Sequence, residues 1–317
     1  MLKGKKIIIT GAGGFIGTYF LEKLKDDNEV IALLRQDISK YWRLKLFEKN
    51  YKVEIVDITE REKVMSVFSR EKPDIILHFA STGTYPGHQN DRDALFSTNV
   101  VGGINIIEAS LMYSDITINT GSSSEYGKVP CPMNEKGPTF PTILYGATKL
   151  FTTHYAKIRA EEEKKRLITI RPFSVYGPYE EPFRLIPYVL SSALLNKKIK
   201  LSSPRSVRDF IFIEDFYDAT IHLINKTDQL GYGEIFNIGT GKEASIGDLV
   251  KILENEVLKK NLDIEWGLVQ KQPELEHWYA DISELKKTGY VPVYDLKSGL
   301  AKTYNWLKEN IEYYSRE

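Results

Sequence analysis

The 317-residue chain is long enough to bury a substantial core in one large or two modest domains. Its 43 basic and 43 acidic residues balance, which argues against a protein that neutralises many nucleic-acid phosphates. A single cysteine, Cys131, excludes an internal disulfide, and five scattered histidines suggest no metal site. With no signal peptide or apolar run of about 18 residues in view, we expect a cytoplasmic protein that does not span a membrane.

A glycine-rich turn follows the first predicted strand. Residues 5–10 are typical of a short buried strand, and the chain then passes through Gly11, Gly14 and Gly17 into a helical stretch over 15–25. Gly11 would make a tight turn, Gly14 would let backbone N–H groups approach a pyrophosphate, and Gly17 would allow close helix packing. The pattern predicts a dinucleotide site, although an ordinary tight turn has similar spacing.

The end of the second predicted strand bears on the choice of dinucleotide. This strand, 29–34, ends at Arg35. In NAD-binding folds an acidic residue about 20 positions after the glycines binds the ribose 2′-hydroxyl, whereas an arginine suits the 2′-phosphate of NADP. Arg35 therefore favours NADP as the cofactor, and Asp37, which could also reach the ribose, keeps NAD as the alternative.

Strands and helices continue to alternate. Strands are predicted at 52–56, 74–79, 116–120 and 167–171, and helices at 41–50, 60–71, 94–113 and within 142–165. This rhythm predicts right-handed βαβ units in a Rossmann-type, doubly wound parallel sheet, an α/β fold. We predict an NAD(P)-binding Rossmann domain over 1–172, completed by a strand that returns near 208–213. Residues 173–317 would form mainly a second, smaller α/β domain for the substrate.

Tyr145 and Lys149 are the central catalytic candidates. They are four residues apart, so on a helix both side chains leave the same face. An ammonium within ~4–6 Å favours a phenolate and lowers the pKa of the phenol, so such a pair can move a proton of a sugar hydroxyl. Spacing alone does not select this pair, because the pattern recurs at Tyr19/Lys23, Tyr41/Lys45 and Tyr304/Lys308.

Taken in order, these motifs resemble the extended short-chain dehydrogenase/reductases, specifically the NAD(P)-dependent nucleotide-sugar epimerase/dehydratase group. The matching segments are Gly11-x-x-Gly14-x-x-Gly17, Asp57-Ile58, His78-Phe79-Ala80, Asn99, Ser122–Gly127, Tyr145-x-x-x-Lys149, Arg171–Pro178, Arg208–Asp215 and Phe236–Gly241. Ordered matches over most of the chain distinguish the Tyr145 pair from the other three.

The resemblance implies catalytic roles. Tyr145 would be the general acid/base, Lys149 would bind the nicotinamide ribose and hold the phenolate, and a serine would orient the reacting C4 oxygen. Counting along the strand makes that serine Ser123, which we favour, whereas counting back from Tyr126 makes it Ser122. On the Ser123 register, Glu125 falls where 4,6-dehydratases keep an acidic residue for water elimination.

The resemblance also implies binding residues. With Tyr145 and Lys149, the cofactor would contact Gly11, Gly14, Phe15, Ile16, Gly17, Arg35, Asp57, Ile58, Phe79, Ala80, Ser81, Asn99, Pro172 and Phe173. The nucleotide-sugar substrate would contact Ser124, Glu125, Ser174, Arg208 and Lys271. Arg208 suits the substrate diphosphate because its guanidinium is a planar fork of donors. Lys271 falls near the place of a second phosphate-binding arginine.

The function implied by the resemblance is redox chemistry at C4 of a nucleotide-linked hexose. We predict an NADPH-dependent 4-reductase of NDP-4-keto-6-deoxyhexoses, because Arg35 favours an exchangeable reduced cofactor. A 4-epimerase like UDP-glucose 4-epimerase is the alternative, followed by a 4,6-dehydratase. A non-catalytic dinucleotide sensor is the contrasting class, although such proteins usually lack the tyrosine or lysine. The resemblance further implies a homodimer formed by the helices around 94–113 and 142–165.

Overall fold

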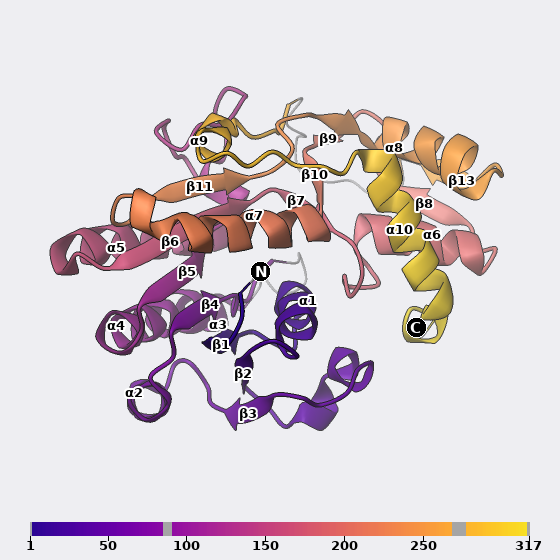
Figure 1. The fold of residues 1–317 in the computed structure, drawn as a ribbon. Coiled ribbons are helices and arrows are strands. Elements are labelled where there is room, and N and C mark those ends of the chain that lie inside the picture. Colours follow the sequence, from indigo (N-terminus) through magenta and orange to yellow (C-terminus); the bar gives the residue numbers. More distant parts are fainter. Residues whose placement is uncertain (1, 85–90, 268–276, 316–317) are drawn as a thin grey trace.

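A seven-stranded parallel sheet forms the centre of the protein (Figure 1). The computed structural model describes residues 2–84, 91–267 and 277–315. In spatial order the strands are β11 (Ile235–Ile238), β6 (Arg166–Pro172), β5 (Ile116–Thr120), β4 (Ile75–His78), β1 (Lys6–Thr10), β2 (Glu29–Leu34) and β3 (Lys52–Ile55). The predicted doubly wound α/β class is confirmed.

Helices cover both faces of this sheet. They are α1 (Phe15–Leu24), α2 (Arg61–Glu71), α4 (Gly103–Tyr113), α5 (Leu144–Glu163) and α7 (Ile213–Lys226). Successive side chains of a strand point to opposite faces, so Ile7 and Ile9 of β1 join the core with α1 and α7. Ile8 joins the second core, with α2 and α4. Because both sides are buried, β1 reads as an uninterrupted apolar run.

The strand order reverses between β1 and β4, where Thr10 pairs with His78 at the carboxyl ends of the two strands. Gly11 follows with a φ of +67°, and a Cβ there would lie 2.7 Å from the backbone nitrogen of Ala80. Only glycine meets both requirements without strain. The chain therefore brings the glycine turn against the end of β4, at the edge where open parallel sheets bind ligands.

Two predicted elements differ in the structure. The helix predicted over 41–50 is replaced by two 3₁₀ turns, Ile38–Lys40 and Trp42–Lys45. Asp37 caps the first turn, because its carboxylate accepts a hydrogen bond from the Ser39 backbone N–H at 2.9 Å. A polar cap and a short turn compete here with the helical pattern.

The strand predicted to return near 208–213 does not join the central sheet. Its residues form β9 (Val207–Arg208), which pairs with β12 (Ala244–Ser245), and β10 (Phe210–Phe212), which pairs with β7 (Ser174–Tyr176). The seventh strand of the central sheet is β11, on the far side of β6. A run of three buried apolar residues has the same appearance in either sheet, so this prediction was wrong.

The other elements complete the fold. They are α3 (Arg92–Phe96), α6 (Leu185–Leu194), β8 (Ile199–Leu201), α8 (Ile246–Ile252), β13 (Ile264–Trp266), α9 (Ser283–Lys287) and α10 (Leu296–Glu309). The helical run Arg92–Tyr113 joins α3 to α4 through a π-helical turn, and by length and composition it could cross a membrane. In this structure 61% of its apolar 18-residue segment is buried, as in the core helix of a folded domain. The division into 1–172 and 173–317 stays a prediction.

Candidate active site

Tyr145 and Lys149 lie in the first two turns of α5 and are both buried, with 7% and 3% of their surface exposed. The Lys149 ammonium donates a hydrogen bond of 2.7 Å to the carbonyl oxygen of Thr120, at the carboxyl end of β5. Burial lowers the pKa of Lys149 to about 8, against the opposing effect of the Glu125 charge. α5 thus delivers a cation to the edge of the sheet where the glycine turn also lies.

The Tyr145 hydroxyl is surrounded by small hydroxyl side chains. Burial has the largest effect and raises the pKa of Tyr145, against the lowering effect of the nearby Thr84, Ser122 and Ser81 hydroxyls. In the protein by itself, desolvation of the phenolate dominates the pKa of Tyr145, and the lowering effect expected of Lys149 stays a prediction. The hydroxyl cluster places hydrogen-bond donors where a phenolate would form.

Ser122 is the serine that the structure brings to Tyr145, although our sequence analysis ranks Ser123 above it. Ser123 begins a 3₁₀ turn, Ser123–Glu125, that Ser122 caps. The Ser122 Oγ accepts a hydrogen bond of 3.1 Å from the Ser124 backbone N–H. Its own hydroxyl proton is therefore available for Tyr145 or for a substrate oxygen.

A neutral histidine lies beside this pair, and our sequence analysis assigned it no role. The Nδ1 atom of His78 is 2.7 Å from the Thr10 Oγ1. Burial, followed by the nearby charge of Lys149, lowers the pKa of His78 to about 3. The position of His78 at the end of β4, opposite the end of β1, was the signal that could have identified it.

The glycine turn and the end of β5 together fit a dinucleotide. Gly14 begins α1 without a side-chain cap, which leaves backbone N–H groups at the helix N-terminus to bind an anion such as a pyrophosphate. A Cβ on Gly17 would collide with the carbonyl oxygen of Gly11, so the close helix packing predicted for Gly17 is present. The buried Oγ1 of Thr120, beside Lys149, has no hydrogen-bond partner among the described residues.

Comparison with known proteins identifies the family. A model of the NAD dependent epimerase/dehydratase family matches residues 7–239, from β1 to just beyond β11. The chain belongs to this family. Membership confirms the resemblance drawn from the motifs, and it means that the chain is an enzyme acting on nucleotide sugars, with chemistry of the epimerase/dehydratase type at C4.

Relatives within the family include both epimerases and dehydratases. A putative UDP-glucose 4-epimerase from Methanocaldococcus jannaschii is 27% identical over 96% of this chain and 99% of that protein. The dTDP-D-glucose 4,6-dehydratase of Homo sapiens is 28% identical over 96% of this chain and 91% of that protein. One name describes epimerisation and the other dehydration of a nucleotide-linked glucose, so together they leave the product open.

A solved structure shows the same fold. The UDP-glucuronic acid 4-epimerase from Bacillus cereus, in complex with UDP-glucuronic acid and NAD, superposes with a TM-score of 0.84. The two sequences are 24% identical, and the match covers 96% of this chain and 99% of that one. The family's architecture is therefore present from end to end.

Glu125 does not face a substrate, contrary to our prediction. Its side chain is 0% exposed, and its Oε2 accepts a 2.7 Å hydrogen bond from the Nε of Arg171, whose side chain is 1% exposed. Its Oε1 accepts hydrogen bonds from Thr153 at 2.9 Å and from the Ser122 backbone N–H at 2.8 Å. A buried guanidinium requires a paired carboxylate, and Glu125 serves this need instead of substrate contact.

Asn99, whose contact with the cofactor stays a prediction, holds a loop in this structure. Its Oδ1 accepts from the Thr82 N–H at 2.9 Å, and its Nδ2 donates to the Thr82 carbonyl and to the Thr148 Oγ1, both at 3.0 Å. These bonds tie the loop that carries Ser81 and Thr84 to α5. Asn99 therefore fixes the two hydroxyls that reach Tyr145 from this loop.

The other predicted cofactor residues lie at or just after the carboxyl ends of β2, β3, β4 and β6, and at the start of α1. Arg35 is exposed after β2, and Phe15 and Ile16 open α1. After β3, Asp57 accepts a hydrogen bond from the Thr59 N–H, and Ile58 is buried. After β4, Phe79 packs on Phe20, and the Ala80 N–H donates to the Thr10 hydroxyl. Pro172 is the last residue of β6, and Phe173 is buried against Tyr126.

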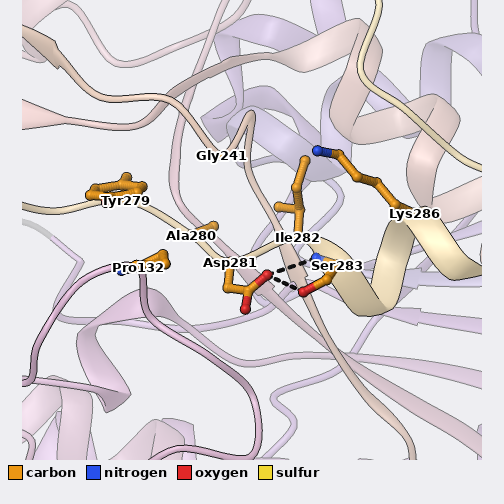
Figure 2. Close-up of a pocket in the computed structure, with 8 residues that line it drawn as sticks. All are labelled: Pro132, Gly241, Tyr279, Ala280, Asp281, Ile282, Ser283 and Lys286. Carbon is orange, nitrogen blue, oxygen red and sulfur yellow. Dashed lines mark hydrogen bonds between the residues drawn. The ribbon is translucent and has the colours of Figure 1, made fainter.

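The predicted substrate residues are more dispersed. Ser124 lies two residues after Ser122, Ser174 begins β7, and Arg208 lies in β9, where its Nη1 donates to the Val207 carbonyl at 2.6 Å. Lys271 lies outside the described residues. A cavity of about 190 Å³ is lined by Pro132, Gly241, Tyr279, Ala280, Asp281, Ile282, Ser283 and Lys286, which are drawn in Figure 2. None of its lining residues was a predicted site residue.

Proposed function

We propose that this family member is a nucleotide-sugar 4-epimerase. The observation that carries this proposal is the burial of the Glu125 carboxylate against Arg171, behind Ser122. On the Ser122 register, the slot in which a dehydratase keeps its acidic residue is occupied by Ser124, and the neighbouring Glu125 is buried against Arg171. The described site therefore offers no carboxylate for water elimination beside Tyr145 and Ser122. The relatives support epimerisation better than the 4-reductase that the sequence led us to favour.

The proposed cofactor is NAD. The family description supports this choice, as does the NAD in the Bacillus cereus epimerase. An epimerase returns the hydride that it removes, so it needs no exchangeable reduced cofactor. Arg35 still favours NADP, and equilibrium dialysis of the protein with each dinucleotide tests the choice: tighter binding of NADP would refute NAD as the resident cofactor.

The residues of the chain would transfer the proton, and a bound dinucleotide would carry the hydride. When bound, NAD would accept a hydride from C4 and return it to the opposite face. Tyr145 would take the proton of the C4 hydroxyl and later give it back, and Ser122 would donate a hydrogen bond to the C4 oxygen. The buried ammonium of Lys149 would favour the phenolate form of Tyr145 in the loaded site.

A substrate panel tests the reaction. The protein with NAD is incubated with UDP- and dTDP-linked hexoses, and products are followed by ¹H NMR together with absorbance at 340 nm. We expect interconversion of C4 epimers without net reduction of cofactor. Formation of a 4-keto-6-deoxy sugar would show a dehydratase, and consumption of NADPH with a 4-keto sugar would show a reductase. Binding of cofactor without turnover would indicate a sensor.

We further propose that two copies pair through α4 and α5. Exposed apolar side chains on these helices and on α3 support this, among them Phe96, Met112, Leu144, Phe151 and Ile158. The three residues on α5 are seven positions apart, so they share one helix face. Sedimentation should show a dimer that Phe151→Glu dissociates. A wild-type monomer at micromolar concentration would refute the dimer.

A further inference from the structure

A fully buried ion pair lies directly behind the catalytic serine. Glu125 and Arg171 are 2.7 Å apart, with side chains 0% and 1% exposed. The Arg171 Nη1 also donates to the Tyr126 hydroxyl at 3.0 Å, and its guanidinium lies over the Tyr126 ring at 4.7 Å. Tyr126 in turn donates to the Asn237 Oδ1 at 2.7 Å, so the pair is held from β6, β11 and the loop after β5.

Such a pair is not explained by stability alone. Replacing a buried ion pair with apolar residues of similar volume is often neutral or stabilising. The nucleotide-sugar chemistry proposed above does not use Glu125 as an acid or base, because both of its oxygens are engaged inside the protein. What distinguishes this carboxylate is its direct bond to the backbone of Ser122.

Glu125 and Ser122 form a reciprocal capping box. The Glu125 Oε1 accepts from the Ser122 N–H at 2.8 Å, and the Ser122 Oγ accepts from the Ser124 N–H at 3.1 Å. The first bond fixes the backbone of Ser122, and the second occupies an acceptor site of its hydroxyl. Together they hold Ser122 in the neighbourhood of Tyr145, whose pKa the Ser122 hydroxyl lowers.

We infer that Glu125, clamped by Arg171, is a positioning residue that holds Ser122 in the orientation from which it hydrogen-bonds Tyr145. This inference rests on the proposed function, because Ser122 matters for rate only if Tyr145 moves the proton. The Glu125 charge also raises the pKa values of Tyr145 and Lys149. Loss of that charge should therefore shift the pH–rate profile toward lower pH. The other charged or titratable groups described around these residues include Arg171, Tyr126 and His78.

Glu71 supplies a matched control. Its side chain is 6% exposed and is paired with Lys52 and Arg70. It lies at the end of α2 beside Lys6, the first residue of β1, and so at the amino ends of the strands, whereas Ser122 follows the carboxyl end of β5. Glu71→Gln therefore breaks the pairing of a buried carboxylate, with partners that are about half exposed, without touching Ser122. A loss of stability common to both sites can then be separated from an effect on Ser122.

The test compares three variants with the wild type, namely Glu125→Gln, the double variant Glu125→Leu/Arg171→Met, and Glu71→Gln. Both changes at Glu125 should lower kcat on the order of tenfold to hundredfold, because a displacement of about 1 Å is enough for such a loss. KM should stay within about twofold, since substrate binding is retained. Glu71→Gln should keep the wild-type kcat. A folded double variant with wild-type kcat and pH profile would overturn the inference.

Amide hydrogen exchange separates this inference from the proposed function. In cofactor-free protein, the Ser122 and Ser124 amides should exchange faster in the double variant and at the wild-type rate in Glu71→Gln. If the wild type turns over no nucleotide sugar, the proposed function fails, but the exchange measurement still reports on the positioning of Ser122. Unchanged protection of both amides in the double variant would refute the positioning role on its own.

Discussion

Three helices of this protein, α1, α5 and α10, carry the same Tyr-x-x-x-Lys spacing, and the pairs on α1 and α5 differ most clearly in their surroundings. In α1, the ammonium of Lys23 lies 5.4 Å from the centre of the Tyr19 ring and the lysine is exposed to solvent. In α5, Lys149 is buried and donates to the end of β5, and Tyr145 meets three hydroxyl side chains. Both tyrosines are buried, and burial raises the pKa of each.

The difference lies in what each helix faces. The Tyr19 ring packs at 6.0 Å against Tyr217 of α7, which belongs to the covering layer of the sheet. The corresponding face of α5 is turned to the carboxyl ends of the central strands, where the glycine turn and Ser122 also lie. Spacing on a helix decides that two side chains converge, and the topology of the sheet decides what they converge upon.

The largest difference between the two helices should appear when each tyrosine hydroxyl is removed. Tyr145→Phe should lower kcat by about a thousandfold, because general acid–base catalysis contributes roughly 10²–10⁴. Tyr19→Phe should leave kcat within twofold, since that hydroxyl lies in the layer between α1 and α7. Dinucleotide binding, followed by fluorescence, should survive both changes. Equal activity of the two variants would show that Tyr145 is not the acid/base.

The neighbouring serines sharpen the comparison at the α5 site. Ser122→Ala should lower kcat on the order of tenfold to hundredfold, because it removes a hydrogen bond made to the proton-transfer oxygens. Ser123→Ala should cost no more than about threefold, because that residue begins the turn without capping it. The reverse order of the two variants in steady-state kinetics would restore the register that the sequence favoured.

Sequence reasoning reached the sheet, the glycine turn and the Tyr145 pair because each is set by local pattern. It could not choose between Ser122 and Ser123, since a shift of one residue at a strand end turns every side chain to the other face. Nor could it predict the burial of Glu125, which depends on Arg171, 46 residues away on β6. The returning strand was misplaced for the same reason, because pairing of β11 with β6 is a long-range choice.

Replacement of the two lysines should have different effects on the free energy of unfolding. Burial lowers the pKa of Lys149 from 10.5 to about 8, so its charge costs the fold about 3 kcal/mol at neutral pH. Lys149→Met should abolish turnover yet stabilise the cofactor-free protein by about 2 kcal/mol, after the loss of the bond to Thr120. Lys23→Met should change the free energy of unfolding by no more than about 0.5 kcal/mol, as expected for an exposed side chain.

Urea denaturation at several pH values checks the sign of this effect. The unfolded chain holds the lysine proton up to pH 10.5, whereas native Lys149 releases it near pH 8. Between these values the unfolded state binds more protons, so wild-type stability should rise with pH. The advantage of Lys149→Met should therefore be full below pH 8 and fade above it. An unstable Lys149→Met variant at pH 7 would contradict the cost assigned to the buried charge.

The smallest effect concerns His78, which lies near Lys149 of α5; the pair on α1 has no such neighbour among the described contacts. Its native pKa is about 3 instead of 6.5, so between these values the unfolded state binds the extra proton and stability falls as the pH falls. Between pH 7 and pH 5.5 this group should cost the fold about 1 kcal/mol. His78→Asn should flatten that part of the urea-derived stability curve, whereas Lys23→Met, which leaves the ring in place, should keep the wild-type slope. An unchanged slope in His78→Asn would mean that the ring beside Lys149 is protonated in the native protein.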